Sequence, residues 1–340
     1  MKQEHGGFVY GKGDILDFSA NINPLGIPES VRSAVMASAD MWDKYPDPFC
    51  TELREKMAKK LGISAETVVC GNGADDLIYR LVHALKPKNS LICAPTFGEY
   101  AKALGEVDCK IDRIYLSESS DFAVSDDVCD ILTANIDMCV LCSPNNPTGR
   151  LISPNILEKA AERCAENGTI LVVDECFAGF AENAENWQKN GNCIVLGAFT
   201  KLYAMAGLRL GYALCGTAEI AEKLRKSGQY WSVSVPAQAA GIAALDEDEY
   251  VRETVKLISR ERRYIAENLT SMGLKVYPSD VNYLLFMGDI GLGDRLFSEG
   301  ILIRNCGNYE GLGEGFYRAA VRTHPENQRF IEALRRCVNG

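Results

Sequence analysis

Short apolar runs alternate with longer amphipathic stretches between about residue 30 and residue 235. The apolar runs are four to seven residues long, which is typical of buried strands. The stretches at 74–85 and 154–167 repeat their apolar positions with the period of a helix. Because strands alternate with helices, the pattern predicts an α/β fold, with a mostly parallel sheet between two helical layers. We expect the strands at 67–70, 90–93, 110–116, 137–142, 169–173, 193–199 and 210–215.

The two ends of the chain have different patterns. The first 28 residues are rich in Gly, Asn and Pro and predict an extended N-terminal arm. Near the C-terminus, a long helical stretch at 246–272 precedes shorter strand-like runs and a terminal helix, which indicates a smaller α+β domain. We therefore expect an arm at 1–28, a large α/β domain at 29–235 and a small domain at 236–340. The strands of the small domain are expected near 281–286, 301–304 and 317–322.

The composition of the chain limits which binding partners and which cellular compartment we expect. The formal net charge of −10 argues against nucleic acid or an anionic membrane surface as the main partner. No run approaches the roughly 18 apolar residues of a membrane-spanning helix, and the chain does not start with a signal-peptide pattern. Thirteen cysteines are scattered in apolar surroundings, which is typical of reduced thiols in a reducing compartment. We therefore expect a soluble cytoplasmic protein.

Two residue types limit the possible chemistry. The three histidines are His5, His83 and His324, which argues against a histidine-based nucleophilic triad or a multi-histidine metal site. Cys139 and Cys142 form a C-x-x-C pair, but residues i and i+3 of a strand point to opposite faces and no second pair follows. We therefore expect no metal site. The chemistry must come from Lys, Asp, Arg and Asn side chains, with a bound cofactor.

Polar residues follow three of the predicted strands directly, where α/β proteins bind ligands. Asn146 lies in a turn-like stretch after one strand, Asp174 follows the next, and Lys201 follows a third. The first two are 28 residues apart, the second and third are 27 apart, and Arg209 comes eight residues later. Each feature alone has an ordinary explanation as a turn, a helix cap or a solvated strand end. Together they indicate one site at the carboxyl edge of the sheet.

With these residues, the sequence resembles the fold-type I enzymes that use pyridoxal 5′-phosphate, in the class I and II aminotransferase group, over nearly the whole chain. The resemblance implies that Lys201 holds the cofactor as a Schiff base and that Asp174 pairs with the pyridine nitrogen, which a buried carboxylate keeps protonated. Asn146 would donate to the phenolic oxygen, and Arg209 would bind the phosphate. The other implied cofactor contacts are Gly73, Ala74 and Asp75 at a helix start, Phe97 stacked on the ring, Thr200 and Tyr45.

Tyr45 also bears on assembly. In this group a tyrosine at the matching position, in the motif Tyr-Pro-Asp, reaches the cofactor phosphate of the neighbouring subunit. The resemblance therefore implies a homodimer with shared active sites.

Two families of the group share the most motifs with this chain: L-threonine-O-3-phosphate decarboxylases of cobalamin biosynthesis and, next, histidinol-phosphate aminotransferases. The asparagine-rich string LDFSANINPLG at 16–26 is the most specific match to the decarboxylases. The implied reaction is decarboxylation of L-threonine O-3-phosphate to (R)-1-amino-2-propanol O-2-phosphate. The other matching motifs are HGG at 5–7, GLRLGY at 207–212, ILIR at 301–304, NYEGL at 308–312, and YR at 317–318 followed by Arg322.

Three positions separate this chain from its relatives. Transaminases of the group usually carry a tyrosine three residues after the ring aspartate, whereas this chain has Phe177, as the decarboxylases do. A Ser or Thr that bonds the phosphate is replaced by Ala198. The decarboxylase pattern has Arg-Ser where this chain has Gly197 and Ala198.

The resemblance also implies which residues bind the substrate. Arg318 matches the substrate-binding arginine of the family, and the planar fork of arginine pairs with a carboxylate or phosphate at two points. The expected partner is a small phosphorylated amino acid. The alternatives are an aminotransferase for histidinol phosphate or another amino acid, an L-serine O-phosphate decarboxylase, and a protein of this fold without catalysis. The remaining implied substrate contacts are His5, Asn23, Asn146, Arg304 and Arg322.

Overall fold

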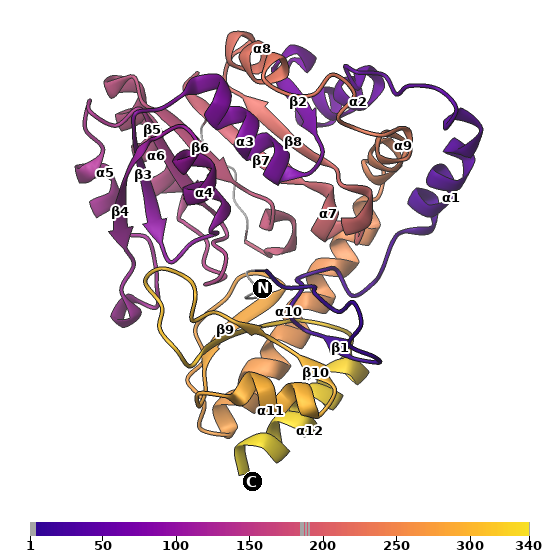
Figure 1. Ribbon diagram of the computed structural model, residues 1–340, viewed down its shortest axis with the longest axis vertical. Helices are drawn as coiled ribbons and strands as arrows, with labels where there is room; N and C mark the ends of the chain where they lie inside the picture. The colour runs from indigo at the N-terminus through magenta and orange to yellow at the C-terminus, as the bar shows by residue number, and fades with distance from the viewer. Residues whose placement is uncertain (1–4, 184–186, 188, 190, 340) are drawn as a thin grey trace.

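A seven-stranded sheet forms the centre of the larger body, at the top of Figure 1. The computed structural model describes residues 5–183, 187, 189 and 191–339. The strands are β2 (Val68–Gly71), β3 (Asn89–Ala94), β4 (Lys110–Tyr115), β5 (Met138–Cys142), β6 (Ile170–Asp174), β7 (Cys193–Ala198) and β8 (Gly211–Cys215). Their order is β2-β8-β7-β6-β5-β3-β4. β8 is antiparallel to both of its neighbours, and the other adjacent pairs are parallel, which confirms the predicted mostly parallel sheet.

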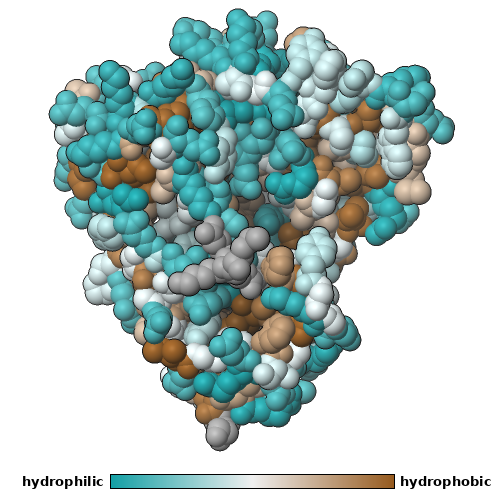
Figure 2. Space-filling view, viewed as in Figure 1, coloured by the Kyte–Doolittle hydropathy of each residue, from teal (hydrophilic) through white to brown (hydrophobic). Residues whose placement is uncertain are grey.

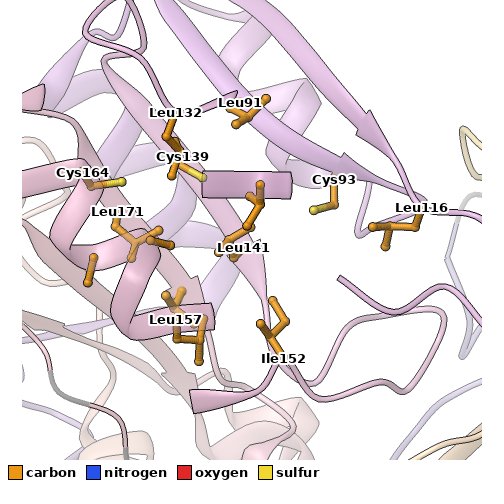
Figure 3. Close-up of a cluster of buried hydrophobic side chains, with 14 of the residues drawn as sticks. Leu91, Cys93, Leu116, Leu132, Cys139, Leu141, Ile152, Leu157, Cys164 and Leu171 are labelled. Atoms are coloured by element: carbon orange, nitrogen blue, oxygen red, sulfur yellow. The ribbon is translucent and has the colours of Figure 1, made fainter. Parts of the chain in front are cut away.

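Helices cover both faces of this sheet, as the period of their apolar positions predicts. One face packs against α3 (Ala74–Leu85), α4 (Glu99–Gly105) and α8 (Ala218–Lys226). The other face packs against α5 (Asp127–Ile131) and α6 (Pro154–Asn167). Figure 3 shows the apolar cluster on this second face, formed by side chains of β3, β5, β6 and α6. The three-layer α/β/α arrangement is therefore confirmed.

The smaller body lies below the sheet in Figure 1. Its core is a three-stranded antiparallel sheet in the order β11-β12-β9, packed against long helices. The strand expected over 301–304 is split, because β10 ends at Leu302 and pairs with the N-terminal arm, whereas β11 begins at Arg304 in the other sheet. The elements are α10 (Asp248–Ser271), β9 (Tyr283–Met287), α11 (Leu292–Ser298), β10 (Ile301–Leu302), β11 (Arg304–Asn305), β12 (Phe316–Ala320) and α12 (His324–Asn339).

The N-terminal arm is more ordered than the expected extended loop. Its strand β1 (Leu16–Asp17) pairs in parallel with β10, which ties the arm to the smaller body. Arg322 fixes the same segment, because its Nη1 donates to the Asp17 carbonyl at 3.1 Å. The arm then runs between the two bodies, where the N-terminus is marked in Figure 1.

The helices nearest the predicted domain boundary pack together. α9 (Val235–Ala244) begins at the predicted boundary and packs against α1 (Glu29–Ala37) and α2 (Thr51–Leu61) of the larger body. The boundary at residue 235 thus stays a prediction, and the first helix that packs in the core of the smaller body is α10. Figure 2 shows hydrophobic surface residues on the side of α1 and α9, at the right of the view.

Most predicted elements agree with the structure within one or two residues. The helices expected at 74–85 and 154–167 have those bounds, and each predicted strand of the large sheet overlaps an observed one. Cys139 and Cys142 belong to the apolar clusters on opposite faces of the sheet, as the strand geometry predicts. No helix in the described part of the chain is long and apolar enough to cross a membrane.

Candidate active site

The predicted polar residues meet where three parallel strands end. Asp174 is the last residue of β6, Asn146 follows β5, and Lys201 lies in the short helix α7 (Phe199–Leu202) directly after β7. Together they line a cavity of about 220 Å³ between the larger body, the smaller body and the arm. The sequence-predicted residues on its wall are His5, Ala74, Asp75, Phe97, Asn146, Asp174, Thr200, Lys201, Arg209 and Arg318.

Hydrogen bonds from the N-terminal arm fix the backbone of the segment that carries Lys201. The Lys201 carbonyl accepts a hydrogen bond from the Asn23 backbone N–H at 3.1 Å, and the Asn23 side chain donates to the Leu202 carbonyl at 2.7 Å. Burial lowers the pKa of Lys201 below its ordinary value of 10.5, and the positive charge of Arg318 lowers this pKa further. An amine with a lowered pKa is more readily neutral near pH 7, so Lys201 is suited to attack a carbonyl carbon.

Asp174 is a buried carboxylate with two protein donors. Its side chain is 5% exposed. The Tyr100 hydroxyl donates to Oδ2 at 2.5 Å, and the Cys176 backbone N–H donates to Oδ1 at 2.9 Å. Burial raises the pKa of Tyr100 well above 10, and the charge of Asp174 raises it further, so the phenol remains a donor near neutral pH. Because Asp174 also borders the cavity, it can accept a hydrogen bond from a protonated ring nitrogen.

The start of α3 forms another part of the cavity wall. Gly73 precedes the helix with a φ of +89°, and a Cβ at this position would lie 2.5 Å from the Arg209 Nη2 atom. Glycine therefore lets the guanidinium lie against the turn. Ala74 and Asp75, the first two residues of the helix, line the cavity with Thr200. Backbone N–H groups at a helix start and a nearby guanidinium suit a phosphate group.

Asp75 introduces an opposing charge at this end. Its Oδ2 lies 3.9 Å from the Arg209 Nη2, a loose ion pair with both side chains about half exposed. Partial burial raises the pKa of Asp75, and the charge of Arg209 opposes that shift. A bound phosphate would therefore compete with Asp75 for the guanidinium.

Arg318 gives the cavity a buried positive charge. Its side chain is 5% exposed. Its Nη2 donates to the Ser19 carbonyl at 2.8 Å, its Nη1 donates to Asn146 Oδ1, and its Nε has no hydrogen-bond partner. In the part of the chain that the structure describes, no carboxylate forms an ion pair with it. A buried guanidinium without a counter-charge is costly, so this position fits an acidic group of a ligand.

A second cavity of about 240 Å³ adjoins the first and shares the residues His5, Phe97 and Tyr309 with it. Arg304 lines this second cavity and is 4% exposed. Its Nη2 donates to Asn308 Oδ1 at 2.8 Å, and its guanidinium lies over the Tyr309 ring, 5.3 Å from the centroid.

Two further cations line the second cavity, Lys102 and Arg113. Lys102 Nζ lies 2.9 Å from Glu99 Oε1, which also contacts His5 Nε2 at 2.9 Å. Arg113 Nε lies 2.7 Å from Glu310 Oε2. The acidic partners offset part of the charge. Among the residues that the structure describes, the wall carries three cationic side chains, those of Lys102, Arg113 and Arg304, and one carboxylate, that of Glu310, so the second cavity is also suited to an anionic group.

Four predicted residues line neither cavity: Gly73, which directly precedes α3, and three residues whose side chains are described next. Asn23 is buried, and its Nδ2 also donates to Thr254 Oγ1 at 2.7 Å, so both amide hydrogens are used within the protein. Arg322 forms an ion pair with Glu326, at 2.6 Å from Nη2 to Oε1. Tyr45 lies on the surface and is 77% exposed. The structure therefore does not bring these three side chains to the cavity of this chain.

Sequence reasoning missed several residues on the cavity wall, above all Tyr100 and Asn21. Tyr100 could have been found from its spacing, because it follows Phe97 by three residues, about one helical turn. Asn21 lies in the same motif as Asn23, but a turn intervenes, in which the Ile22 N–H donates to the Ala20 carbonyl at 3.0 Å. The motif alone does not show which asparagine faces the cavity. Ser19, Cys142, Cys176 and Tyr309 were also missed.

The positions at which this chain differs from other members of the aminotransferase group also lie at this site. Phe177 lines the cavity and packs edge-on against Tyr283, with ring centroids 5.0 Å apart; its side chain brings no hydroxyl to the wall. Ala198 lines the cavity without a side-chain donor. A Cβ at Gly197 would lie 2.2 Å from the Tyr212 ring, so in this chain a larger residue at position 197 would require that ring to move.

These residues fit pyridoxal phosphate. A lysine with a lowered pKa is suited to bind its aldehyde, and the buried carboxylate of Asp174 is suited to its ring nitrogen. The start of α3 with Arg209 and Thr200 is suited to its phosphate. Arg318 remains for the acidic group of a substrate.

Comparisons with known proteins agree with this assignment. A sequence model of the family "Aminotransferase class I and II" matches residues 13–334. The threonine-phosphate decarboxylase of Salmonella typhimurium is 36% identical over 334 residues, covering 96% of this chain and 92% of that protein. The histidinol-phosphate aminotransferase of Desulfitobacterium hafniense is 34% identical over 337 residues, covering 94% and 91%.

A solved structure of a similar protein has the same fold. The crystal structure of the histidinol-phosphate aminotransferase from Clostridium acetobutylicum superposes with a TM-score of 0.88 at 28% identity, covering 96% of this chain and 99% of that one. The family, the fold and the residues of the cavity lead to one conclusion: the chain belongs to the class I and II aminotransferase family, whose members depend on pyridoxal phosphate.

Proposed function

We propose that this chain decarboxylates L-threonine O-3-phosphate to (R)-1-amino-2-propanol O-2-phosphate, as an enzyme of cobalamin biosynthesis. The observation that carries the proposal is the presence of two adjoining cationic sites. Arg318 borders the first cavity, and Arg304 borders the second with Lys102 and Arg113. Threonine phosphate carries two acidic groups, a carboxylate and a phosphate, and so can occupy both sites. Histidinol phosphate carries only the phosphate.

The two sites also suggest how the reacting bond is selected. When bound, pyridoxal phosphate withdraws electrons from the bond at the substrate Cα that stands perpendicular to its ring. We assign the carboxylate to Arg318, whose guanidinium is fixed by the Ser19 carbonyl and by Asn146. We assign the phosphate to Arg304 and its neighbours. Binding energy from the remote phosphate then orients the bond between Cα and the carboxylate.

Phe177 supports the same choice. Transaminases of the group usually have a tyrosine at this position, and the Phe177 ring is fixed by its contact with Tyr283. The similarity to the Salmonella decarboxylase is in agreement, but an aminotransferase at 34% identity is nearly as similar. Transamination is therefore the alternative that an assay must exclude.

We also propose a homodimer in which Tyr45 contributes to the site of the second subunit. Tyr45 stacks on Trp231 with ring centroids 4.3 Å apart, and both side chains are exposed. Tyr230 and Phe49 extend this group, at 59% and 52% exposure. An exposed aromatic cluster of this kind is typical of an interface. The buried thiols of the core support a reducing cytoplasm as the compartment.

A substrate panel tests the proposed reaction. The loaded enzyme is incubated separately with O-phospho-L-threonine, O-phospho-L-serine and L-histidinol phosphate, and both CO₂ release and the cofactor spectrum are recorded. We expect rapid CO₂ release from the threonine compound and slower release from serine phosphate, which lacks one methyl group. Accumulation of the pyridoxamine form with histidinol phosphate, without CO₂ from either amino acid, would instead establish an aminotransferase. No spectral response to any of the three would indicate a protein without this catalysis.

A further inference from the structure

Two cysteines line a cavity that shares no wall residue with the two described above. This cavity has a volume of about 210 Å³ and lies between α2, β2, α3 and α8, at the top of Figure 1. Cys50 directly precedes α2, and Cys70 lies in β2. The two residues are 4% and 7% exposed, so a reagent must enter the cavity to reach their thiols.

The packing of α2 on β2 brings the two cysteines together. Arg54 joins the two elements, because its Nε donates to the Val68 carbonyl at 2.9 Å and its backbone N–H donates to the Cys50 carbonyl at 2.9 Å. Val68 and Cys70 are two residues apart on a strand and therefore point to the same face, where both join Cys50 in one apolar cluster. Contact with the Cys50 thiol raises the pKa of Cys70 well above its ordinary value of 9, and burial raises it further.

The wall of this cavity has a surplus of positive charge. Among the residues that the structure describes, one carboxylate lines it, that of Glu222, with four cationic side chains, those of Arg54, Arg80, Arg225 and Lys226. Glu222 is shared between two of these cations, at 3.2 Å from the Arg225 Nε and 3.3 Å from the Lys226 Nζ. The cavity is therefore suited to a ligand that carries negative charge.

We propose that Cys50 and Cys70 form a redox-modification site, and that the cavity binds the oxidant, a small disulfide that carries carboxylates. The Cys50 thiolate attacks one sulfur of this disulfide, whose S–S bond breaks and releases one half as a thiol. The Cys70 sulfur then displaces the other half from Cys50 and forms the bond between the two cysteines. Two protein thiols are thus oxidised to a disulfide while the small disulfide is reduced to two thiols, so electrons and protons balance.

The order of attack follows from the thiolate requirement. The thiolate is the nucleophile, and the raised pKa of Cys70 makes this residue the poorer first attacker. In a reducing compartment the pair stays as thiols, and a rise in small disulfides drives the exchange.

Oxidation would join two segments near the cofactor. Cys70 directly precedes Gly71, whose carbonyl accepts the Gly73 backbone N–H at 2.8 Å in the turn before α3. Cys50 lies five residues after Tyr45. The new bond would therefore connect the segment that carries Tyr45 with the strand that leads to the cofactor turn. The proposal does not depend on the reaction proposed above.

Three disulfides of similar size and different charge test the site. The loaded enzyme is treated separately with dithiodipropionate, which is anionic, with hydroxyethyl disulfide, which is neutral, and with cystamine, which is cationic. We expect the protein to lose two hydrogens without keeping any part of the reagent, about tenfold faster or more with dithiodipropionate than with cystamine. Peptide mapping should find Cys50 linked to Cys70. Equal rates, or a link between other cysteines, would overturn the proposal.

Variants of α8 and of the pair provide matched controls. Lys226→Gln should slow the reaction of dithiodipropionate severalfold and leave that of hydroxyethyl disulfide unchanged. Lys223→Gln makes the same change of charge about one turn earlier in α8, outside the cavity, and should alter both rates less than twofold. An equal effect of the two variants would refute binding in the cavity. Cys70→Ser should keep one half of the reagent on Cys50, and an unmodified Cys50 would refute the order of attack.

Urea unfolding shows whether the link forms in the folded protein. A bond between Cys50 and Cys70 closes a loop of about 20 residues in the unfolded chain, so the urea midpoint of the oxidised enzyme should be higher than that of the reduced enzyme. The midpoint of Cys50→Ser should not respond to the same treatment. A lower midpoint after oxidation would mean that the two thiols meet only when the chain opens, and would overturn the proposal.

Discussion

The bond from Tyr100 to Asp174 offers a direct perturbation of the cofactor site. Tyr100→Phe removes one oxygen and keeps the ring, which is 1% exposed and packs edge-on against Phe97 with centroids 5.6 Å apart. In the variant, Asp174 keeps the bond from the Cys176 backbone N–H and loses the bond from the phenol. It isolates the hydroxyl, because the shape of the core changes little.

The expected magnitude follows from the charge of the acceptor. A hydrogen bond to an ionised group contributes about 1.5–3 kcal/mol, whereas a bond between neutral groups contributes about 0.5–1.5 kcal/mol. Tyr283 is the matched control, because it is also fully buried and its hydroxyl donates to a neutral acceptor, the Asn145 carbonyl, at 2.9 Å. We expect Tyr100→Phe to lower the free energy of unfolding of the apoenzyme by about 2 kcal/mol, and Tyr283→Phe by about 1 kcal/mol.

Urea unfolding of both variants, with and without pyridoxal phosphate, measures these differences. The loss in Tyr100→Phe should be smaller in the loaded enzyme, since the ring nitrogen then provides Asp174 with a second donor. The loss in Tyr283→Phe should not depend on the cofactor through Asp174. Equal losses in the two variants, or a Tyr100→Phe loss that does not respond to loading, would refute the role assigned to the Tyr100 hydroxyl.

Four further predictions concern other parts of the site. Lys201→Ala should remove the adduct that borohydride fixes in the loaded wild type, and a remaining adduct would place the cofactor on another lysine. Because burial lowers the pKa of Lys201 below 10.5, loading of the apoenzyme should reach half its maximal rate below pH 10.5, and a midpoint at or above that value would contradict the shift. Heterodimers of Tyr45→Ala and Lys201→Ala should regain activity if the site is shared, and their complete inactivity would argue against sharing. Phe177→Tyr should lower the pKa of the lysine–cofactor Schiff base in an absorbance titration, because the new hydroxyl stabilises the phenolate oxygen; an unchanged pKa in a folded, loaded variant would place Phe177 away from the ring oxygen.

The sheet and the centre of the site could be predicted because local signals determine them. Each strand is a short apolar run, and parallel strands bring their carboxyl ends to one edge. In the observed register Cys142 lies opposite Asp174, so the residues that follow β5 and those at the end of β6 meet at that edge. Asp174, Asn146 and Lys201 therefore come together without any information on loops.

The substrate side could not be predicted to the same degree, because it depends on contacts between distant segments. Arg322 matches a family position, yet its guanidinium donates to the Asp17 carbonyl of the distant N-terminal arm at 3.1 Å and also pairs with Glu326 in the first turn of α12. The arm turns between Asn21 and Asn23, and this turn determines which amide faces the cavity. Spacing in the sequence does not encode either outcome.

The central claim is that this chain breaks the bond between Cα and the carboxylate, and one doubly labelled substrate tests it. O-phospho-L-threonine carrying ¹³C in the carboxylate and deuterium at Cα is incubated with the loaded enzyme, and the products are analysed by mass spectrometry. Decarboxylation predicts ¹³CO₂ and an amine phosphate that keeps its deuterium. An oxo acid that keeps the ¹³C label, with deuterium lost to water, would show that the enzyme breaks the Cα–H bond and transaminates, and would contradict the claim.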